Sequence, residues 1–268
     1  MGIENAVLNR ARLLIGDEGM DRLNKIRVII FGVGGVGSWC AESLVRSGVT
    51  HLTIVDSDRV CITNINRQLM ATLATVGEVK VDALKEHLLL INPKAQIDAR
   101  QQIFDETTAE SFDLESYDYI VDCIDSLKDK ALLIQLATRT KARFLSSMGA
   151  ALKMDPTRIK VAEFWNVKGC PLARALRNKF KRQKRFPSKK FKCVFSDELL
   201  GNKGKESSCG TDRCMCPKTE TGPGDSSLIN HEWCSSKAQI NGSLMHITSI
   251  FGITLGGLVI EDAISRES

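Results

Sequence analysis

A glycine-rich turn is the first feature of this sequence that can do chemistry. It lies in the stretch IFGVGGVGSW, where an apolar run meets a helical pattern, and its glycines are Gly32, Gly34, Gly35 and Gly37. Gly32, Gly34 and Gly37 have the spacing of a dinucleotide-binding turn. Such a turn uses positive φ angles, lets a phosphate approach the backbone closely and presents the N–H groups of the following helix to the anion. Asp56, which ends the next apolar run, is placed to accept hydrogen bonds from a ribose. The turn predicts a nucleotide ligand, but it does not separate NAD from ATP.

Charged and polar residues farther along the chain distinguish between NAD and ATP as the ligand. Arg67 and Lys80 supply positive charge that a dehydrogenase does not need, whereas attack on the α-phosphate of ATP develops negative charge on the phosphoryl oxygens and the pyrophosphate. Asn64 and Asn66 can hold phosphate or ribose oxygens. Asp125 ends a strand pattern, where an acid can hold Mg²⁺ on the triphosphate. The set favours ATP with magnesium.

Each of these residues also has a purely structural interpretation. Arg67 and Lys80 can be solvated charges on a helix face, and Asn64 and Asn66 can be turn residues. Asp125 can cap the helix that begins in SLKDK. It is the joint occurrence of these residues at these spacings that favours the chemical interpretation.

Alternating hydrophobic patterns place these residues on an α/β fold. We expect a helix near 10–23, strands in KIRVIIFG, HLTIVD, AQIDARQQI, YDYIVDCID and ARFLSSMG, and helices in SWCAESLVRSG, VKVDALKEHLLLINP and LKDKALLIQLATRT. The first strand–helix–strand unit has the length that a right-handed parallel crossover needs. The pattern predicts a Rossmann-like, doubly wound, mainly parallel sheet with N-terminal helices, and we assign an ATP-binding core to residues 1–155.

Residues 156–268 are expected to form a basic and loop-rich appendage that packs on the same domain. RIKVAEFW is strand-like, CPLARALRNKFKR is a basic helix, residues 200–236 predict a long loop, and a helix is expected over 240–264. The apolar run 247–260 is shorter than the ~18 residues of a membrane span and predicts a buried core helix. The N-terminal residues show no apolar signal core, so we expect a cytoplasmic protein without membrane contact.

Positive charge is concentrated in one segment. The 268-residue chain has a formal net charge of +5, yet residues 174–192 carry ten lysines and arginines and no acid. This basic segment predicts an anionic partner. Phe180, Phe186 and Phe191 lie within it and can either stack on bases or pack in the core. A solvated helix and loop is the alternative interpretation of the whole segment.

Nine cysteines without a secretion signal indicate reduced thiols or a metal site rather than a disulfide framework. Cys209, Cys214 and Cys216 lie close together and could bind a metal with Cys234 or His231, although unliganded thiols are the alternative. Cys234 is most simply a spectator thiol, with a role in sulfur or acyl transfer as the alternative.

These motifs together resemble the ThiF/MoeB-type adenylating enzymes, which are relatives of the ubiquitin-activating enzymes. The resemblance is carried by ARLLIGDEGMDRL, GVGGVGSW, DSDRVCITNINRQ, VGEVK and DCIDS. It implies a homodimer that binds Mg-ATP and adenylates a carboxylate, with Arg12 reaching the ATP of the partner subunit. The full set expected to contact the nucleotide is Arg12, Gly32, Gly34, Gly35, Gly37, Asp56, Asp58, Asn64, Arg67, Lys80 and Asp125, of which Arg67, Lys80 and Asp125 are the expected catalytic residues.

Within that superfamily, NINRQ, DCIDS, GAALKMDPTRI, CPLARALR and CVFSDE look most like the tRNA threonylcarbamoyladenosine dehydratase branch. The resemblance implies adenylation of the carboxylate of threonylcarbamoyl-adenosine in tRNA, followed by ring closure as the carbamoyl nitrogen displaces AMP. It also implies a sulfur-relay protein as a further partner. In this branch the basic segment 174–192 would contact tRNA phosphates.

Three other functions remain open from the sequence. One is adenylation of a ubiquitin-like sulfur-carrier protein, although relatives with that activity usually have C-x-x-C pairs for Zn²⁺ and this chain has none. Another is a tRNA-binding module without catalysis, which would have no physical need for Arg67, Lys80 and Asp125 together. The third is an NAD-dependent oxidoreductase, for which the sequence shows no His or Tyr clearly placed for proton transfer.

Overall fold

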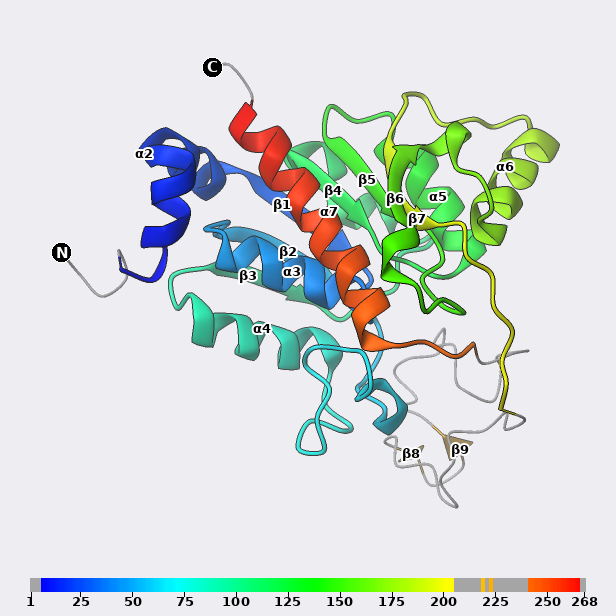
Figure 1. Cartoon of the computed structure of the whole chain (residues 1–268), viewed down its shortest axis with the longest axis horizontal. Coiled ribbons are helices and arrows are strands. Elements are labelled where there is room, and N and C mark those ends of the chain that lie inside the picture. Colours follow the sequence, from blue (N-terminus) through cyan, green and yellow to red (C-terminus); the bar gives the residue numbers. More distant parts are fainter. Residues whose placement is uncertain (1–5, 205–217, 220–221, 224–240, 266–268) are drawn as a thin grey trace.

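Seven strands form one sheet in the order β3-β2-β1-β4-β5-β7-β6 (Figure 1). The computed structural model describes residues 6–204, 218–219, 222–223 and 241–265. The strands are β1 Arg27–Phe31, β2 His51–Val55, β3 Gln96–Arg100, β4 Tyr119–Asp122, β5 Arg143–Ser147, β6 Ile159–Glu163 and β7 Lys192–Ser196. All neighbouring pairs are parallel except β6 and β7. The mainly parallel α/β sheet predicted from the sequence is therefore confirmed.

Helices cover both faces of the sheet. They are α2 Asn9–Lys25, α3 Gly37–Arg46, α4 Lys80–Ile91, α5 Leu127–Ala137, α6 Pro171–Gln183 and α7 Met245–Ser265. Buried side chains of α3, α4 and α7 form one hydrophobic cluster with the sheet, and those of α5 and α6 form a second. These two clusters correspond to the two layers of a doubly wound fold.

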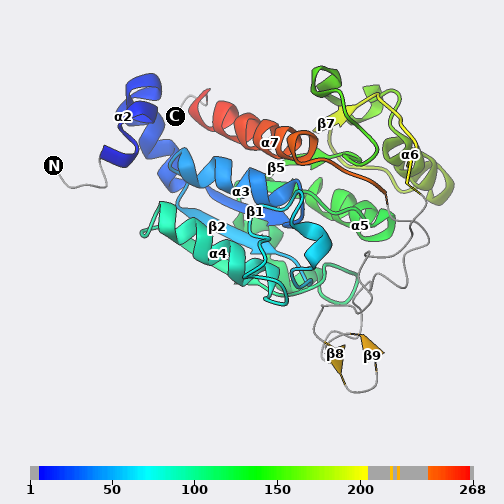
Figure 2. The same cartoon turned by 60° about the horizontal axis from the view of Figure 1, so that its bottom comes forward.

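The closing helix α7 lies along α3, as Figures 1 and 2 show. Glycine makes this close approach possible, because a Cβ on Gly252 would lie 2.2 Å from the Val36 carbonyl oxygen. By length and composition alone α7 is apolar enough to cross a membrane, but half of its apolar window is buried in the protein. Phe251, Leu255 and Val259 are fully buried there, as expected for a core helix.

Several boundaries differ from the sequence-based expectations. The closing helix begins at Met245 rather than at residue 240, because residues 241–244 are irregular. Strand β7 was not predicted, since its run KCVFS directly follows a strongly basic stretch. Residues 218–219 and 222–223 pair as two short strands, β8 and β9, within the loop expected over 200–236. The rest of that loop from residue 205 onward lies outside the described residues.

Candidate functional site

The order in which successive strands are added to the sheet reverses between β1 and β4, and the glycine turn lies at this point. Strand β1 pairs with β2 on one side and with β4 on the other, so the chain leaves β1 toward one half of the sheet and later returns to the other half. Ligands of open α/β sheets bind in the crevice at the carboxyl ends of such strands. The turn follows Phe31, the last residue of β1.

Glycine is required at two positions of the turn, for different reasons. Gly32 has a φ of 83°, and a Cβ there would lie 2.8 Å from the Cys123 carbonyl oxygen. Gly37 does not need a positive φ, but its Cβ would lie 1.9 Å from the Gly32 carbonyl oxygen. The expectation of positive φ angles across the turn is therefore wrong except at Gly32, because the chain enters α3 immediately after the turn and adopts ordinary helical geometry there.

The turn offers backbone donors to an anion. The N–H groups of Gly34, Gly35 and Val36 donate to no other residue in the part of the chain that the structure describes. A Cβ on Gly34 would meet nothing closer than the Gln68 side chain at 3.7 Å, so the backbone is open to close approach. Free N–H groups at the start of a helix fit a phosphate group.

Gln68 is a residue of this site that the sequence reasoning missed. Its side chain is 6% exposed, and its Oε1 has no hydrogen-bond partner among the described residues. A buried polar atom without a partner indicates that a ligand or a water completes the site. The signal was available in the motif NINRQ, where Gln68 directly follows Arg67.

Asp56 fixes the glycine turn to the end of β2. Its Oδ2 accepts the Val33 N–H at 2.8 Å, and its Oδ1 accepts the Asp58 N–H at 2.9 Å. Burial raises the pKa of Asp56, and Lys80 acts in the opposite direction. Each oxygen keeps a second lone pair, so the expected bond from a ribose hydroxyl remains compatible with this arrangement.

Lys80 lies at the first residue of α4 beside two carboxylates. Its Nζ is 2.6 Å from Asp58 Oδ2 and 3.8 Å from Asp56 Oδ1, and its side chain is 7% exposed. Burial disfavours the charged form, but Asp56 and Asp58 outweigh burial and raise the pKa of Lys80. The ammonium is therefore held charged and in a fixed place next to the residues that anchor the turn.

Arg67 lies against the glycine turn, and its backbone is tied to α3. Its Nη1 donates to the Thr63 carbonyl oxygen at 2.7 Å and to Asn66 Oδ1 at 2.9 Å, while its own carbonyl accepts from Trp39 Nε1 at 3.0 Å. A Cβ on Gly35 would lie 3.3 Å from Arg67 Cγ. Burial lowers the pKa of Arg67.

The two asparagines have structural partners. Asn64 Oδ1 accepts the Cys61 N–H at 3.0 Å, and Asn66 Nδ2 donates to the Ser243 carbonyl oxygen at 2.9 Å. The turn-residue interpretation therefore describes both side chains in this structure. Asn66 also joins the Arg67 loop to the segment that precedes α7.

Asp125 follows β4 and is exposed. Its charge favours the charged forms of both Arg67 and Lys80, although burial still lowers the pKa of Arg67, so the three predicted catalytic residues lie within electrostatic range of one another. The structural alternative for Asp125 does not hold, because the residue that caps α5 is Ser126, whose side chain accepts the Asp129 N–H. An exposed carboxylate beside two cations is a suitable donor for Mg²⁺ on a triphosphate.

A buried ion pair supports the loop that carries Asp125. Lys130 and Asp122 are both fully buried, with Nζ 2.7 Å from Oδ2, and Lys130 also donates to the Ile124 carbonyl oxygen at 2.9 Å. Ser146 Oγ donates to the same Asp122 oxygen at 2.7 Å. Sequence reasoning missed Lys130, because a lysine in a helical pattern ordinarily indicates an exposed position.

Arg12 is not part of this cluster within one chain. It lies on α2, and its side chain pairs with Asp17 at 2.5 Å rather than with residues of the glycine turn. The structure therefore brings together the turn, Asp56, Asp58, Asn64, Arg67, Lys80 and Asp125, and it places Arg12 elsewhere.

The described cysteines show no metal site. No group of three or more His, Cys, Asp or Glu side chains within the described ranges could hold a metal ion. Cys40 and Cys193 are buried, and burial raises the pKa of Cys40 to about 12 and that of Cys193 above its usual value, which disfavours the thiolate form of both. The candidate metal ligands Cys209, Cys214 and Cys216, together with Cys234, lie outside the described residues.

The basic segment 174–192 forms α6 and the chain that leads into β7. Its exposed cations are Arg174, Lys181, Arg182, Lys184, Arg185, Lys190 and Lys192. Phe180 and Phe191 are buried, so the stacking role considered for them is wrong and they pack in the core instead. Phe186 is 51% exposed and remains accessible to a base.

Comparison with known proteins gives a consistent set of relatives. The model of the ThiF family matches residues 8–260. The chain is 34% identical over 256 residues to a tRNA threonylcarbamoyladenosine dehydratase of Bacillus subtilis, covering 95% of this chain and 93% of that protein. It is also similar to two crystal structures of the Escherichia coli tRNA N6-threonylcarbamoyladenosine dehydratase, TcdA. The complex with ATP has a TM-score of 0.80 at 25% identity, covering 99% of this chain and 96% of that one. The complex with AMP has a TM-score of 0.79 at 26% identity, with coverage of 99% and 96%.

Proposed function

The chain belongs to the ThiF family, and from that premise we propose that it is an ATP-dependent tRNA threonylcarbamoyladenosine dehydratase. One observation carries the proposal above the others. The similarity to the Bacillus subtilis dehydratase extends over 95% of this chain and 93% of that protein, so it includes the part after residue 155 as well as the nucleotide-binding fold. The cluster of Arg67, Lys80 and Asp125 beside a glycine turn supports an active enzyme rather than a scaffold.

ATP fits the described site through its phosphates and ribose. The free N–H groups of Gly34 and Gly35 would receive phosphate oxygens, and Asp56 would accept a bond from the ribose. Arg67 and Lys80 would stabilise the charge that develops on the α-phosphoryl group and the leaving pyrophosphate. Asp125 would hold Mg²⁺, which neutralises phosphate charge when it is bound.

The chemistry proceeds in two steps on this arrangement. The carboxylate oxygen of the substrate attacks the α-phosphorus of ATP, and the bond to pyrophosphate breaks. The carbamoyl nitrogen of the same substrate then attacks the activated carbonyl carbon, loses its proton and expels AMP, which carries away one carboxylate oxygen. The ring closure is intramolecular and has a high effective concentration, so the protein needs only to position the groups and exclude water.

The tRNA would lie along the exposed cations of α6 and the chain leading to β7. No acidic residue interrupts residues 174–192, and most of their cations are exposed. Phosphate contacts of this kind make affinity strongly dependent on salt. Phe186 is the one aromatic side chain of this segment that is exposed enough to stack on a base.

We infer that the chain works as a homodimer in the cytoplasm, with Arg12 completing the site of the partner subunit. Arg12 does not contact the glycine turn of its own chain, which agrees with a role across an interface. Leu13 and Leu14 on α2 are 79% and 85% exposed, and Ile253 on the outer side of α7 is 49% exposed. Exposed apolar side chains on two neighbouring helices support a covered surface. A sulfur-relay protein would be an additional partner.

AMP release with different acceptors tests the proposed function. Purified protein with Mg-ATP should release AMP and pyrophosphate in the presence of tRNA that carries threonylcarbamoyl-adenosine, and the nucleoside should lose the mass of one water. The same tRNA without the modification provides the matched control and should release neither product. AMP release only with a sulfur-carrier protein would assign the chain to sulfur-carrier activation. If neither acceptor gives turnover, a tRNA-binding module becomes the leading hypothesis.

A further inference from the structure

Two side chains at the start of α3 contact the loop that carries Arg67. Ser38 and Trp39 directly follow Gly37, the last glycine of the turn, and belong to the motif GVGGVGSW. Residues 67–69 of the loop return to them from a distant part of the sequence, and the contact made by Trp39 spans 28 residues. The motif therefore contains two polar side chains whose role the phosphate-binding turn alone does not explain.

Trp39 binds the main chain of Arg67 itself. The indole Nε1, which is the only donor of a tryptophan side chain, donates to the Arg67 carbonyl oxygen at 3.0 Å. Helix α7 packs directly on Trp39, because a Cβ on Gly252 would lie 2.9 Å from the Trp39 Cβ. The indole thus extends from a helix that α7 keeps in place to the backbone of the proposed catalytic residue.

Ser38 joins the same loop to the glycine turn. Its buried Oγ accepts the Leu69 N–H at 3.3 Å and donates to the Gly34 carbonyl oxygen at 2.7 Å. The bonds from Trp39 and Ser38 therefore reach the loop backbone on either side of Gln68. With the chain held at both positions, the backbone of Arg67 moves away from the turn only when one of these bonds breaks.

The position of this backbone decides where the guanidinium of Arg67 lies. A Cβ on Gly35 would lie 3.3 Å from Arg67 Cγ and 3.3 Å from Thr248 Cβ, so the stem of Arg67 rests directly on the turn. Within the described part of the chain, the guanidinium hydrogen bonds go to Thr63 and Asn66 of its own loop. These bonds do not tie the guanidinium to the turn, so its placement there depends on the contacts that hold the loop.

We propose that Trp39 is a positioning residue that acts through Arg67. The inference rests on the proposed ATP site, in which Arg67 contacts the phosphates. The indole N–H holds the main chain of Arg67 at the place from which the guanidinium reaches a phosphate, so the loop is ordered before ATP binds. A group that is already ordered costs less conformational entropy when its ligand arrives. Trp39 needs no contact with ATP for this role.

Calorimetric titration of the full-length protein with α,β-methylene-ATP and Mg²⁺ tests the proposal. The methylene group prevents cleavage at the α-phosphate, so the titration measures binding alone. Trp39→Phe keeps an aromatic ring but removes the N–H donor. Nucleotide binding must then supply the ordering of the loop that the hydrogen bond provided. We expect the affinity to fall about three- to tenfold, which corresponds to the net strength of one neutral hydrogen bond.

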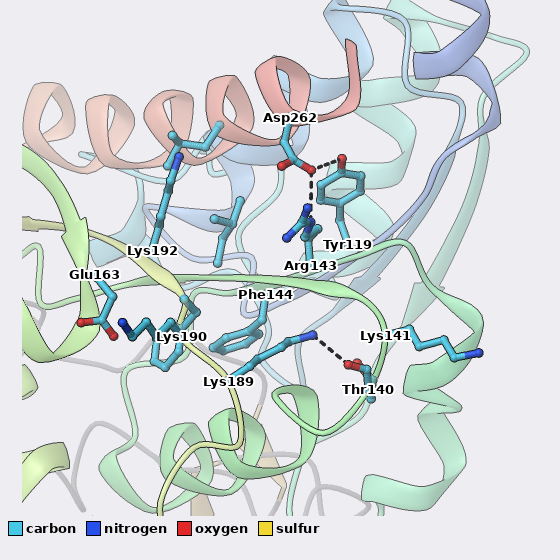
Figure 3. Close-up of a pocket in the computed structure, with 13 residues that line it drawn as sticks. Tyr119, Thr140, Lys141, Arg143, Phe144, Glu163, Lys189, Lys190, Lys192 and Asp262 are labelled. Carbon is cyan, nitrogen blue, oxygen red and sulfur yellow. Dashed lines mark hydrogen bonds and ion pairs between the residues drawn. The ribbon is translucent and has the colours of Figure 1, made fainter. Parts of the chain in front are cut away.

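Tyr119→Phe is the matched control, because it also removes one donor from an aromatic side chain. The Tyr119 hydroxyl donates to Asp262 Oδ2 at 2.7 Å beside a cavity at the amino ends of the strands (Figure 3). Tyr119 begins β4, so the length of a strand separates it from the carboxyl edge of the sheet, where the glycine turn lies. We expect this variant to melt at a lower temperature while its nucleotide affinity changes less than twofold. Equal losses of affinity in Tyr119→Phe and Trp39→Phe would indicate a general effect of stability and would overturn the proposal.

Combination with Arg67→Ala separates an effect through Arg67 from an independent one. Alanine keeps the carbonyl oxygen that Trp39 binds, but it has no guanidinium to position. Trp39→Phe should therefore cause no further loss of affinity in the Arg67→Ala background. Losses that multiply in the double variant, or an unchanged affinity in Trp39→Phe alone, would overturn the proposal.

A second variant decides the proposal if Trp39→Phe does not fold. Benzothiophene in place of the Trp39 indole keeps the size of the ring system and replaces the N–H by sulfur, and the same loss of affinity is expected. Arg67→Ala that binds the analogue as tightly as the unaltered protein would remove Arg67 from the ATP site and overturn the proposal with it. Absence of AMP release with modified tRNA would contradict only the dehydratase function, because none of these titrations requires turnover.

Discussion

Replacing Lys130 by methionine should cost about 3–5 kcal/mol of folding free energy, because the change leaves Asp122 buried without its partner. Both side chains are fully buried, and the ion pair measures 2.7 Å. Methionine keeps most of the volume, so loss of packing contributes little. Most of the penalty therefore comes from the uncompensated carboxylate, which Ser146 and the Ile124 N–H only partly satisfy. The loss is a large fraction of the roughly 5–15 kcal/mol that stabilises a typical domain.

The pH dependence of this variant has a definite sign. Burial raises the pKa of Asp122, and Lys130 acts to lower it, so removing Lys130 raises the pKa further. An acid whose pKa is higher in the folded than in the unfolded state favours folding at low pH, and this stability is lost as the pH rises through the folded pKa. The stability deficit of Lys130→Met relative to the unaltered protein should therefore shrink as the pH falls from 7 toward 5.

Urea denaturation followed by circular dichroism measures this effect, with Asp122→Asn and the double variant Asp122→Asn/Lys130→Met completing a cycle. The double variant should lose less stability than the sum of the two single losses, with a coupling on the order of 0.5–3 kcal/mol. A loss below about 1 kcal/mol for Lys130→Met, or strict additivity in the cycle, would refute the role given to the buried pair.

Three further predictions concern the glycine turn, the proposed catalytic residue Arg67 and the loss of stability at low pH. Gly32→Ala should destabilise the fold by about 1–3 kcal/mol in a thermal melt, because the residue has a φ of 83° and its Cβ would lie 2.8 Å from a carbonyl oxygen. The control Gly257→Ala, in open space on α7, should be neutral or stabilising in the same measurement. Arg67→Ala should abolish AMP formation with tRNA while its melting temperature stays near that of the unaltered protein, and a folded, fully active variant would show that Arg67 is not catalytic. Lys160 and Arg158, at 2.7 and 2.8 Å, lower the pKa of Asp197 to about 2. The stability that Asp197 contributes is thus present above its ordinary pKa and lost as the pH falls from about 4 to about 2. Carboxyl NMR titration should find the low pKa in the unaltered protein and a return toward the ordinary value in Lys160→Ala, and an unshifted Asp197 would contradict the ion pairing.

The fold could be predicted well from the sequence because most of its strands are buried on both faces. In β1 every residue from Val28 to Phe31 is buried, and such a strand appears as a continuous β-branched and aromatic run. Strand β7 was missed because it begins with an exposed lysine and directly follows the basic segment. Its identity depends on pairing with β5 and β6, which are distant in the sequence.

The main residues of the candidate site could be predicted from the sequence, but the contacts between them could not. The motifs indicated Arg67, Lys80 and Asp125, whereas the pairing of Lys80 with Asp58 and the support of the Asp125 loop by Lys130 follow from contacts made only after folding. Gln68 was missed for the same reason, since its burial depends on packing beside the turn. Periodicity indicates which face a residue occupies, but it does not indicate which polar groups remain without partners.

Transfer of a labelled oxygen tests the adenylation of a carboxylate most directly. The protein is incubated with Mg-ATP and tRNA whose threonylcarbamoyl-adenosine carries ¹⁸O in its carboxylate, and the released AMP is analysed by mass spectrometry. The proposed reaction predicts one ¹⁸O atom in each AMP, because the carboxylate oxygen that attacks the α-phosphorus leaves with it. Formation of cyclised nucleoside with ADP and labelled inorganic phosphate, or with unlabelled AMP, would contradict activation through an adenylate.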